Sequence, residues 1–409
     1  MFWIRFSSRS RCMRALCCGL LYLVVMSTWS STFAADGPTS STEVWLLTYG
    51  PGEIYWQRFG HNAIWIHDTD LGLDHVFNFG FFDFEQDNFF LRYLQGRLLY
   101  FSAAQPVERE FSNYIDENRS IRAQRLDLSP EQSLQLVEYL LDEVQPENRL
   151  YLYDYYTNNC STRVRDALDL ALGGALESSF RSATGAQSLR DHTRRLTIGD
   201  FWFYLALEIV LGAKIDQPIS QWDEFFIPSE LAASLADMEH PGVGGLQPLV
   251  VEDVMLYQSS LQPPPAEPGN WWTRYLLMSM AILAFAGLAC RLLRVLNPLR
   301  LVQGWLLLSG LAGLMMLFFW IFTDHVAVGQ NLNLLVFNPL WWVVLYWKGH
   351  KAAGSVLLLA SMLALSMALL TSQQYTIDVL AAFLPLNIVS GLYLFSGANL
   401  GEKIRLMLL

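Results

Sequence analysis

Hydrophobic residues follow two different patterns along the chain. In residues 36–265 they occur in short runs between charged and polar residues, which is typical of a folded domain of strands and helices. After Trp271 they occur in long uncharged stretches, and most of these are long enough to cross about 30 Å of hydrocarbon. The pattern predicts an N-terminal domain followed by an all-α transmembrane bundle of about five helices, at Tyr275–Cys290, Leu301–Thr323, Val326–Trp347, Ala352–Leu370 and Val379–Gly401.

The third stretch is the least regular of the five. Its densest apolar part, Leu334–Trp347, contains Asn338-Pro339, and its length suits a broken, kinked span or a re-entrant segment. We favour the broken span, because a re-entrant segment would separate Lys403 and Arg405 from the other cations. Polar residues gather at the start of this stretch, where they are either solvated or turned into the bundle to serve a site: His325, Asn331, Asn333 and Asn338.

Strands are predicted in the first part of this domain. Glu43–Tyr49 is one such segment, and His61–His67 is a second, in which alternation places His61 and His67 on the same face. A polar turn follows, and His75–Phe79 forms a third strand, so the last two segments predict a β-hairpin.

Helices are predicted where the start signals and the spacing of apolar residues agree. Ser129-Pro130-Glu131-Gln132 is a capping-box start with proline at the first helical position. Ser161–Leu172 predicts a second helix, which ends at Gly173-Gly174. Phe201–Leu211 is apolar but too short to span a membrane, and it carries Glu208. This segment either packs in the core or lies against the bilayer.

The first 35 residues have the pattern of a secretory signal peptide. Arginines precede an apolar run from Ala15 to Val25, and small residues follow up to Ala34-Ala35. An uncleaved anchor is the alternative, but the apolar run is shorter than a membrane span needs.

Charge supports the same division. Residues 36–271 carry 15 Lys and Arg against 35 Asp and Glu, a net charge of −20, whereas residues 272–409 carry 8 against 3, a net charge of +5. Phosphate recognition needs a basic surface, so the acidic part excludes nucleic acid as a default partner. Seven cations fall on one side of the predicted bundle, which places the acidic domain outside the cytoplasm: Arg291, Arg294, Arg300, Lys348, Lys351, Lys403 and Arg405.

The predicted organisation is therefore a signal peptide at residues 1–35, an extracytoplasmic domain at 36–265 that ends in Pro263-Pro264-Pro265, a linker at 266–272 and a transmembrane domain at 273–409.

Cys160 is the only cysteine expected in the mature outer domain. Three of the five cysteines lie in the predicted signal peptide, and Cys290 lies in the first predicted span. Cys160 stands among polar residues where a helix begins, and a helix N-terminus stabilises a thiolate and lowers the cysteine pKa. We therefore expect a nucleophile; the alternative is a buried, inert thiol.

A nucleophilic cysteine needs a base, and His61 is the favoured candidate because it opens a rigid strand. Asn78, His75 and His67 are candidates to orient its ring, and the choice depends on a hairpin register that the sequence leaves open. His61 and His67 lie about 20 Å apart along one strand, which is too far for a shared ion. We expect neither a metal nor a cofactor.

Several segments together resemble the Lnb family, whose members combine an extracytoplasmic N-terminal domain with a membrane domain. The resemblance covers nearly the whole mature chain. It rests on Arg58–Ala63, Phe77–Phe84, Asn159–Asp166 and Phe225–Leu231 in the outer domain, and on Asp324-His325, Asn331–Leu335 and Asn338–Leu340 in the membrane part.

The resemblance implies a fold, an activity and a site. The implied fold is an α+β, circularly permuted papain-like domain, similar to lecithin:retinol acyltransferase and its relatives. The implied activity moves an acyl chain from the diacylglyceryl group of a bacterial lipoprotein to the amine of its first cysteine. Cys160 would be the nucleophile, His61 the base and Asn78 the group that orients it.

Three further residues are candidates for substrate binding. Arg163 would contact a lipid phosphate, although an ion pair with Asp166 or Asp169 is the alternative for this arginine or for Arg165. His325 and Asn333 would serve from the membrane part.

The favoured hypothesis is thus a multi-pass acyltransferase of the bacterial inner membrane, with its N-terminal domain in the periplasm and lipoproteins, phospholipids and membrane lipids as partners. The alternatives are a membrane-anchored cysteine hydrolase, acting on cell-wall peptides or on lipids, and a non-enzymatic envelope scaffold. The predicted bundle argues against a cell-wall hydrolase, which needs only one anchor. The sequence leaves the oligomeric state open.

Overall fold

A computed structural model describes residues 42–242, 245–293, 297–346 and 350–396. The predicted signal peptide lies outside the described residues, as do Arg294, Lys348, Lys403 and Arg405.

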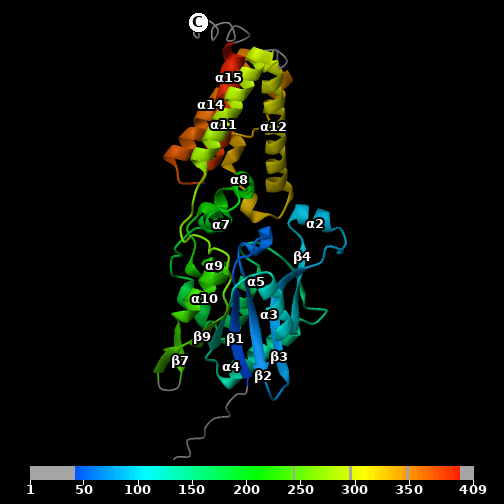
Figure 1. The fold of residues 1–409 in the computed structure, drawn as a ribbon, viewed down its shortest axis with the longest axis vertical. Coiled ribbons are helices and arrows are strands. Elements are labelled where there is room, and N and C mark those ends of the chain that lie inside the picture. The colour runs from blue at the N-terminus through cyan, green and yellow to red at the C-terminus, as the bar shows by residue number, and fades with distance from the viewer. Residues whose placement is uncertain (1–41, 243–244, 294–296, 347–349, 397–409) are drawn as a thin grey trace, which may run out of the picture. The chain divides into compact units, whose positions relative to one another are not determined.

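The N-terminal domain is built around an antiparallel sheet of seven strands in the order β6-β4-β3-β2-β1-β5-β9 (Figure 1). A small hairpin, β7 (Glu239–Gly242) with β8 (Gly245–Pro248), stands apart from it. The strands of the large sheet are β1 (Thr42–Tyr49), β2 (His61–Asp68), β3 (Leu73–Phe82), β4 (Leu99–Pro106), β5 (Ile121–Leu126), β6 (Leu150–Leu152) and β9 (Val250–Tyr257).

The predicted hairpin is confirmed as β2 and β3. Ala63 pairs with Asn78 and Ile66 pairs with His75. Because side chains alternate between the faces of a strand, this register places His61 and Asn78 on one face.

Helices cover both faces of the sheet. One face packs against α4 (Pro130–Glu143), α5 (Cys160–Ala171) and α10 (Pro228–Ala236) around Leu46, Ile64 and Phe77, which are at most 1% exposed. The other face carries a smaller core under α3 (Val107–Asp116). The capping box predicted at Ser129 is confirmed at the start of α4.

Five further α-helices belong to this domain. They are α2 (Phe89–Gln95), α6 (Ala175–Phe180), α7 (Leu189–Thr197), α8 (Phe201–Val210) and α9 (Gln221–Glu224). Residues 258–271 then lead to the membrane part without a helix or strand.

Four helices in the described part of the chain are long and apolar enough to cross a membrane. They are α11 (Trp272–Leu288), which continues in a π-helical turn to Leu293, α12 (Pro298–Phe322), α14 (His350–Leu370) and α15 (Ile377–Ser396) (Figure 1). The third of the five predicted stretches is not one long helix. There the chain forms two 3₁₀ turns, Val326–Val328 and Leu332–Leu335, and the short helix α13 (Trp341–Tyr346).

The contacts of this stretch show that it still passes through the bundle. The end of α12 meets the N-terminal domain, because Arg97 Nε lies 2.6 Å from Asp324 Oδ2. Trp341 instead packs in one cluster with Val302 near the start of α12 and Ala353 near the start of α14. The stretch therefore runs from one end of α12 to the other as a broken segment, which is the form of the span that we favoured.

Backbone groups of the broken segment find partners inside the bundle. Val336 O accepts hydrogen bonds from Asn387 Nδ2 at 3.1 Å and from Ser309 Oγ at 3.2 Å. Irregular backbone at membrane depth is tolerated only where such partners satisfy it.

Candidate active site

Cys160 is the first residue of α5, and a capping box fixes the start of that helix. Asn159 Oδ1 accepts a hydrogen bond from the backbone N–H of Thr162 at 2.9 Å, and Thr162 Oγ1 accepts one from the N–H of Asn159 at 2.8 Å. The cap satisfies two of the free donors at the helix start and so holds Cys160 at one position.

A second set of contacts ties the start of α5 to strand β2. Ser161 Oγ lies 2.8 Å from Asn62 Oδ1 and 2.6 Å from Phe225 O. The Asn62 side chain donates in turn to Leu47 O on β1. Since Asn62 follows His61, these buried contacts bring the cysteine helix to the end of the strand that carries the histidine.

Asn78 is the partner that the structure gives to His61. His61 Nε2 lies 2.9 Å from Asn78 Oδ1, and Asn78 is 1% exposed. An amide oxygen only accepts, so Nε2 carries the proton and Nδ1 is left as the basic nitrogen. The other two candidates lie elsewhere: His67 Nδ1 is 3.3 Å from Asp74 Oδ1, and His75 pairs with Ile66 further along the hairpin.

Burial dominates the ionisation of both groups. It raises the pKa of the Cys160 thiol above its ordinary value, although the backbone N–H groups of Asn62 and Ser161 face the sulfur and act in the opposite direction. Burial lowers the pKa of His61 to about 4, against the effect of its hydrogen bond with Asn78. The expectation that the helix N-terminus lowers the cysteine pKa is therefore wrong in its net direction, because desolvation outweighs the N–H groups.

The resting pair is thus a neutral thiol and a neutral imidazole at pH 7. In the described part of the chain, no hydrogen bond joins the His61 ring to the Cys160 sulfur. Contacts of this kind often tighten only when the substrate binds.

Gly80 lies next to the cysteine, and its backbone conformation accounts for the glycine. A Cβ built on Gly80 would lie 3.5 Å from Cys160 Cβ, and Gly80 has φ +104°, a conformation that favours glycine.

Sequence reasoning missed a group of residues behind His61 on the α3 face of the sheet. The Tyr49 and Tyr114 rings stack with centroids 3.5 Å apart, and the His61 ring stacks 5.9 Å from Tyr49. The Arg119 guanidinium lies 4.6 Å from the Tyr114 ring centroid. These residues come from β1, α3 and the loop after it, so no local pattern links them to His61.

Glu110 belongs to this group and was also missed. It is 1% exposed, and Gln105 Nε2 donates a hydrogen bond to its Oε2. Burial raises the pKa of Glu110, whereas hydrogen bonding to Tyr49, Gln105 and Asn78 lowers it. A buried carboxylate therefore lies behind the residue that contacts His61. In the sequence it is one of several acids in an amphipathic helix, which predicts only a solvated face.

Arg163, a predicted substrate-binding residue, forms an ion pair and a cation–π contact within the protein. Its Nη1 lies 3.4 Å from Glu143 Oε2, and its guanidinium lies over the Tyr151 ring at 4.2 Å from the centroid. The alternative ion pair is present at Arg165, whose Nη2 lies 2.7 Å from Asp166 Oδ1.

His325 and Asn333 lie at two separate places. His325 Nε2 is 3.0 Å from Tyr93 O, and His325 helps to line an open pocket beside α2. Asn333 Nδ2 donates to Glu208 O at 2.8 Å, so it satisfies a carbonyl near the end of α8. Asn331 does the same for Ile209 and Val210.

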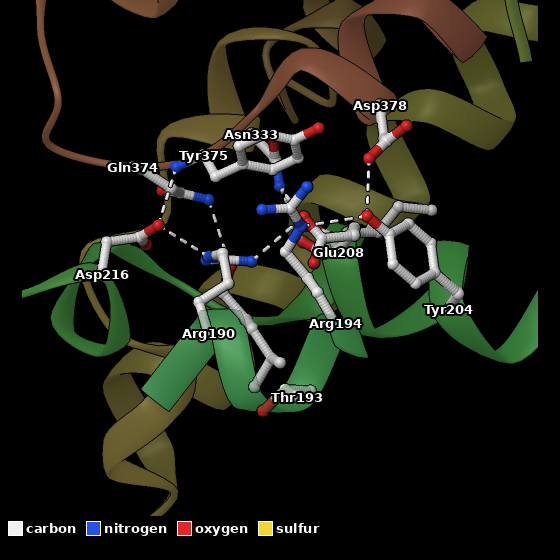
Figure 2. Close-up of polar contacts among 12 residues, drawn as sticks. Arg190, Thr193, Arg194, Tyr204, Glu208, Asp216, Asn333, Gln374, Tyr375 and Asp378 are labelled. Carbon is white, nitrogen blue, oxygen red and sulfur yellow. Dashed lines mark hydrogen bonds and ion pairs between the residues drawn. The ribbon is translucent and has the colours of Figure 1, made fainter. Parts of the chain in front are cut away.

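Asn333 belongs to a buried polar network that joins α7 and α8 to the membrane helices (Figure 2). Arg190 Nε lies 2.8 Å from Asp216 Oδ1, and Arg190 Nη1 lies 3.4 Å from Glu208 Oε2. The Tyr204 hydroxyl donates to Asp378 Oδ2 on α15 at 2.7 Å. The segment with Glu208 therefore packs in a core against the membrane part, which was one of the two expectations for it.

No group of three or more His, Cys, Asp or Glu side chains suited to a metal ion occurs among the residues of the described ranges.

Comparison with known families finds two matches, one for each part of the chain. Residues 29–195 match the Lnb N-terminal periplasmic domain, and residues 271–398 match the Lnb transmembrane domain. No curated protein and no solved structure matches the chain. The first match includes Cys160, His61 and Asn78, and the second includes His325 and Asn333.

Proposed function

The chain belongs to the Lnb family, and we propose that it is a cysteine-dependent acyltransferase of the bacterial inner membrane that acts on lipoproteins from the periplasmic side. The observation that supports this best is the hydrogen bond between His61 on β2 and Asn78 on β3, together with the contact that ties the cysteine helix to β2 through Ser161 and Asn62. The helix with Cys160 follows the strand with His61 in the chain, which is the order of a permuted papain-like domain.

The first half-reaction would transfer the acyl group to the enzyme. His61 Nδ1 removes the Cys160 thiol proton as the sulfur attacks the ester carbonyl of a diacylglyceryl group. The C–S bond forms and the ester C–O bond breaks. The proton from His61 passes to the departing glyceryl oxygen, which leaves a lyso lipid and an acyl-thioester on Cys160.

The second half-reaction would transfer the acyl group to the amine of the lipoprotein's first cysteine. The amine attacks the thioester carbonyl, the C–S bond breaks, and His61 takes the amine proton and returns it to the sulfur. The products are an amide and the free thiol, so the enzyme returns to its starting state.

Backbone N–H groups support this role for the cysteine. Those of Asn62 and Ser161 face the sulfur, and in this proposal they would donate to the oxyanion of the tetrahedral intermediate. A neutral thiol and a neutral imidazole also suit a lipid substrate, because uncharged groups can stay buried without water to solvate them.

The test is to trap the thioester. The full-length protein in lipid vesicles is mixed with a synthetic diacylglyceryl lipopeptide, and the peptide that contains Cys160 is weighed by mass spectrometry. We expect an added acyl group at Cys160 that hydroxylamine removes and that Cys160→Ala and His61→Ala abolish. Cys290→Ala is the matched control, since Cys290 is the other described free cysteine and lies in the membrane part.

The products separate the alternatives. N-acylated lipopeptide and lyso lipopeptide in amounts that balance the acyl groups transferred support the transferase, whereas free fatty acid supports a hydrolase. Normal lipoprotein acylation in cells whose protein carries Cys160→Ala would support a scaffold and overturn the proposal.

A further inference from the structure

We propose that the pocket beside α2 is the entrance through which an acyl chain of a diacylglyceryl lipopeptide reaches Cys160, an inference that rests on the proposed function. Six of the residues that line this open pocket define it: Tyr93, Leu98, Tyr100, Tyr153, Tyr155 and His325. We call it the entry pocket.

The inner wall of the entry pocket adjoins the cysteine. Tyr100 and Tyr153 stack with ring centroids 4.0 Å apart, and both pack with Cys160 against the main core of the domain. The ring centroids of Tyr100 and Phe82 are 5.2 Å apart. Phe82 comes two residues after Gly80, which lies next to Cys160. An acyl chain in the pocket would therefore have its ester end near the sulfur.

The outer wall is the turn that follows membrane helix α12. Asp324 Oδ2 lies 2.6 Å from Arg97 Nε, and the backbone N–H of Asp324 donates to Gln95 O at 2.8 Å. His325 Nε2 lies 3.0 Å from Tyr93 O, and its ring stacks 6.2 Å from Tyr155. These contacts hold the pocket at the end of the membrane bundle from which a lipid would arrive.

The rim beside the pocket is aromatic and unusually exposed. Phe84 is 67% exposed and Phe90 is 79% exposed. Phe89 lies between them, with ring centroids 5.2 Å from Phe84 and 5.4 Å from Phe90. Aromatic residues gather at the boundary between a bilayer and water, so a rim fixed to a membrane helix is suited to contact lipid rather than solvent.

The charges of the entry pocket decide between two kinds of lipid. Its charged residues in the described chain are Asp154 and Asp324, and Arg97 beside them is already paired with Asp324. A phosphate headgroup that passes through this entrance would therefore meet two carboxylates and no unpaired cation among these residues. The end of a diacylglyceryl lipopeptide carries an ammonium group and no phosphate, which suits these charges.

Photo-crosslinking tests this site without relying on catalysis. A diacylglyceryl lipopeptide with a diazirine in one acyl chain is placed in phosphatidylcholine vesicles with the full-length Cys160→Ala protein. After illumination, mass spectrometry locates the adducts. We expect them at residues 82–100 and 153–155, and we expect unlabelled lipopeptide to compete better than anionic phospholipid.

Two matched variants sharpen the result. Phe90→Asp places a charge on the exposed rim and should lower crosslinking about tenfold. Leu134→Asp makes the same kind of change at another exposed apolar residue, on the distant helix α4, and should leave crosslinking unchanged. Thermal unfolding of both variants checks that each is folded.

Three results would each overturn this inference. They are adducts confined to the membrane helices, as much crosslinking in Phe90→Asp as in the protein without that change, and stronger competition by anionic phospholipid than by unlabelled lipopeptide. The proposed function is tested separately by the thioester at Cys160, so either idea can fail while the other stands.

Discussion

His61 Nε2 accepts no proton in the resting site, because it donates its own to Asn78 Oδ1 at a distance of 2.9 Å. This bond leaves Nδ1 as the nitrogen that can act as the proposed base. Replacing Asn78 with Ala removes the partner that fixes the ring, so the rate of Cys160 acylation should fall by about 10²-fold. Burst-phase mass spectrometry measures that rate. An unchanged rate in Asn78→Ala would show that the bond has no part in the reaction.

Glu110 should act on catalysis through Asn78. Glu110→Ala removes the buried carboxylate that the Asn78 amide faces, so we expect kcat to fall about tenfold with KM unchanged. Glu110→Gln keeps an acceptor of the same shape and should restore most of the loss. Equal losses of activity and thermal stability in both variants would instead assign Glu110 a purely structural role.

The pH dependence of acylation should follow the lowered pKa of His61. Because that pKa is about 4, the neutral base persists as the pH falls, and the rate should drop only near pH 4 rather than near 6.5. Between these values the unfolded chain binds a proton that the folded chain does not, so stability should also fall as the pH falls through this window. Initial rates from pH 3.5 to 8 check this, and a midpoint near 6.5 would contradict it.

The capping box at Cys160 should matter for activity as well as for stability. Ser129→Ala removes a capping box and should cost about 1 kcal/mol of unfolding free energy. Asn159→Ala also removes the hydrogen bonds from Nδ2 to Tyr155 O and Phe226 O, so it should cost about 2 to 4 kcal/mol. Only Asn159→Ala should slow acylation, because only α5 carries the thiol. Denaturant unfolding and the acylation rate, measured on both variants, separate the two effects. Equal slowing of both would contradict a positioning role for the cap.

The buried network of Figure 2 should be sensitive to the loss of its cation. Arg190 is 1% exposed and forms ion pairs with Glu208 and Asp216. Arg190→Ala would therefore remove the cation that these two buried carboxylates share. We expect a loss of about 3 to 5 kcal/mol. Arg181→Ala breaks an exposed pair with Glu177 and should cost less than about 1 kcal/mol. Thermal unfolding in detergent compares them, and similar melting temperatures would contradict this prediction.

Local patterns in the sequence were enough for much of the architecture. The alternation in His61–His67 predicted strand β2, the polar residues around Cys160 marked a helix start, and long uncharged stretches marked the membrane helices. Each of these features depends on residues within a few positions of one another. For the same reason Cys160 and His61 could be selected as candidates from the sequence alone, one at a helix start and the other at the start of a strand.

Tertiary structure alone decided the features that depend on distant residues. The register that pairs Ala63 with Asn78 selected the partner of His61, and packing made the third membrane stretch a broken segment. Burial reversed the expected direction of the Cys160 pKa, because desolvation depends on every surrounding element and not on the helix alone. The position of Glu110 behind Asn78 depends on the packing of α3 against the sheet, because its hydrogen-bond partners come from β1, β3 and β4.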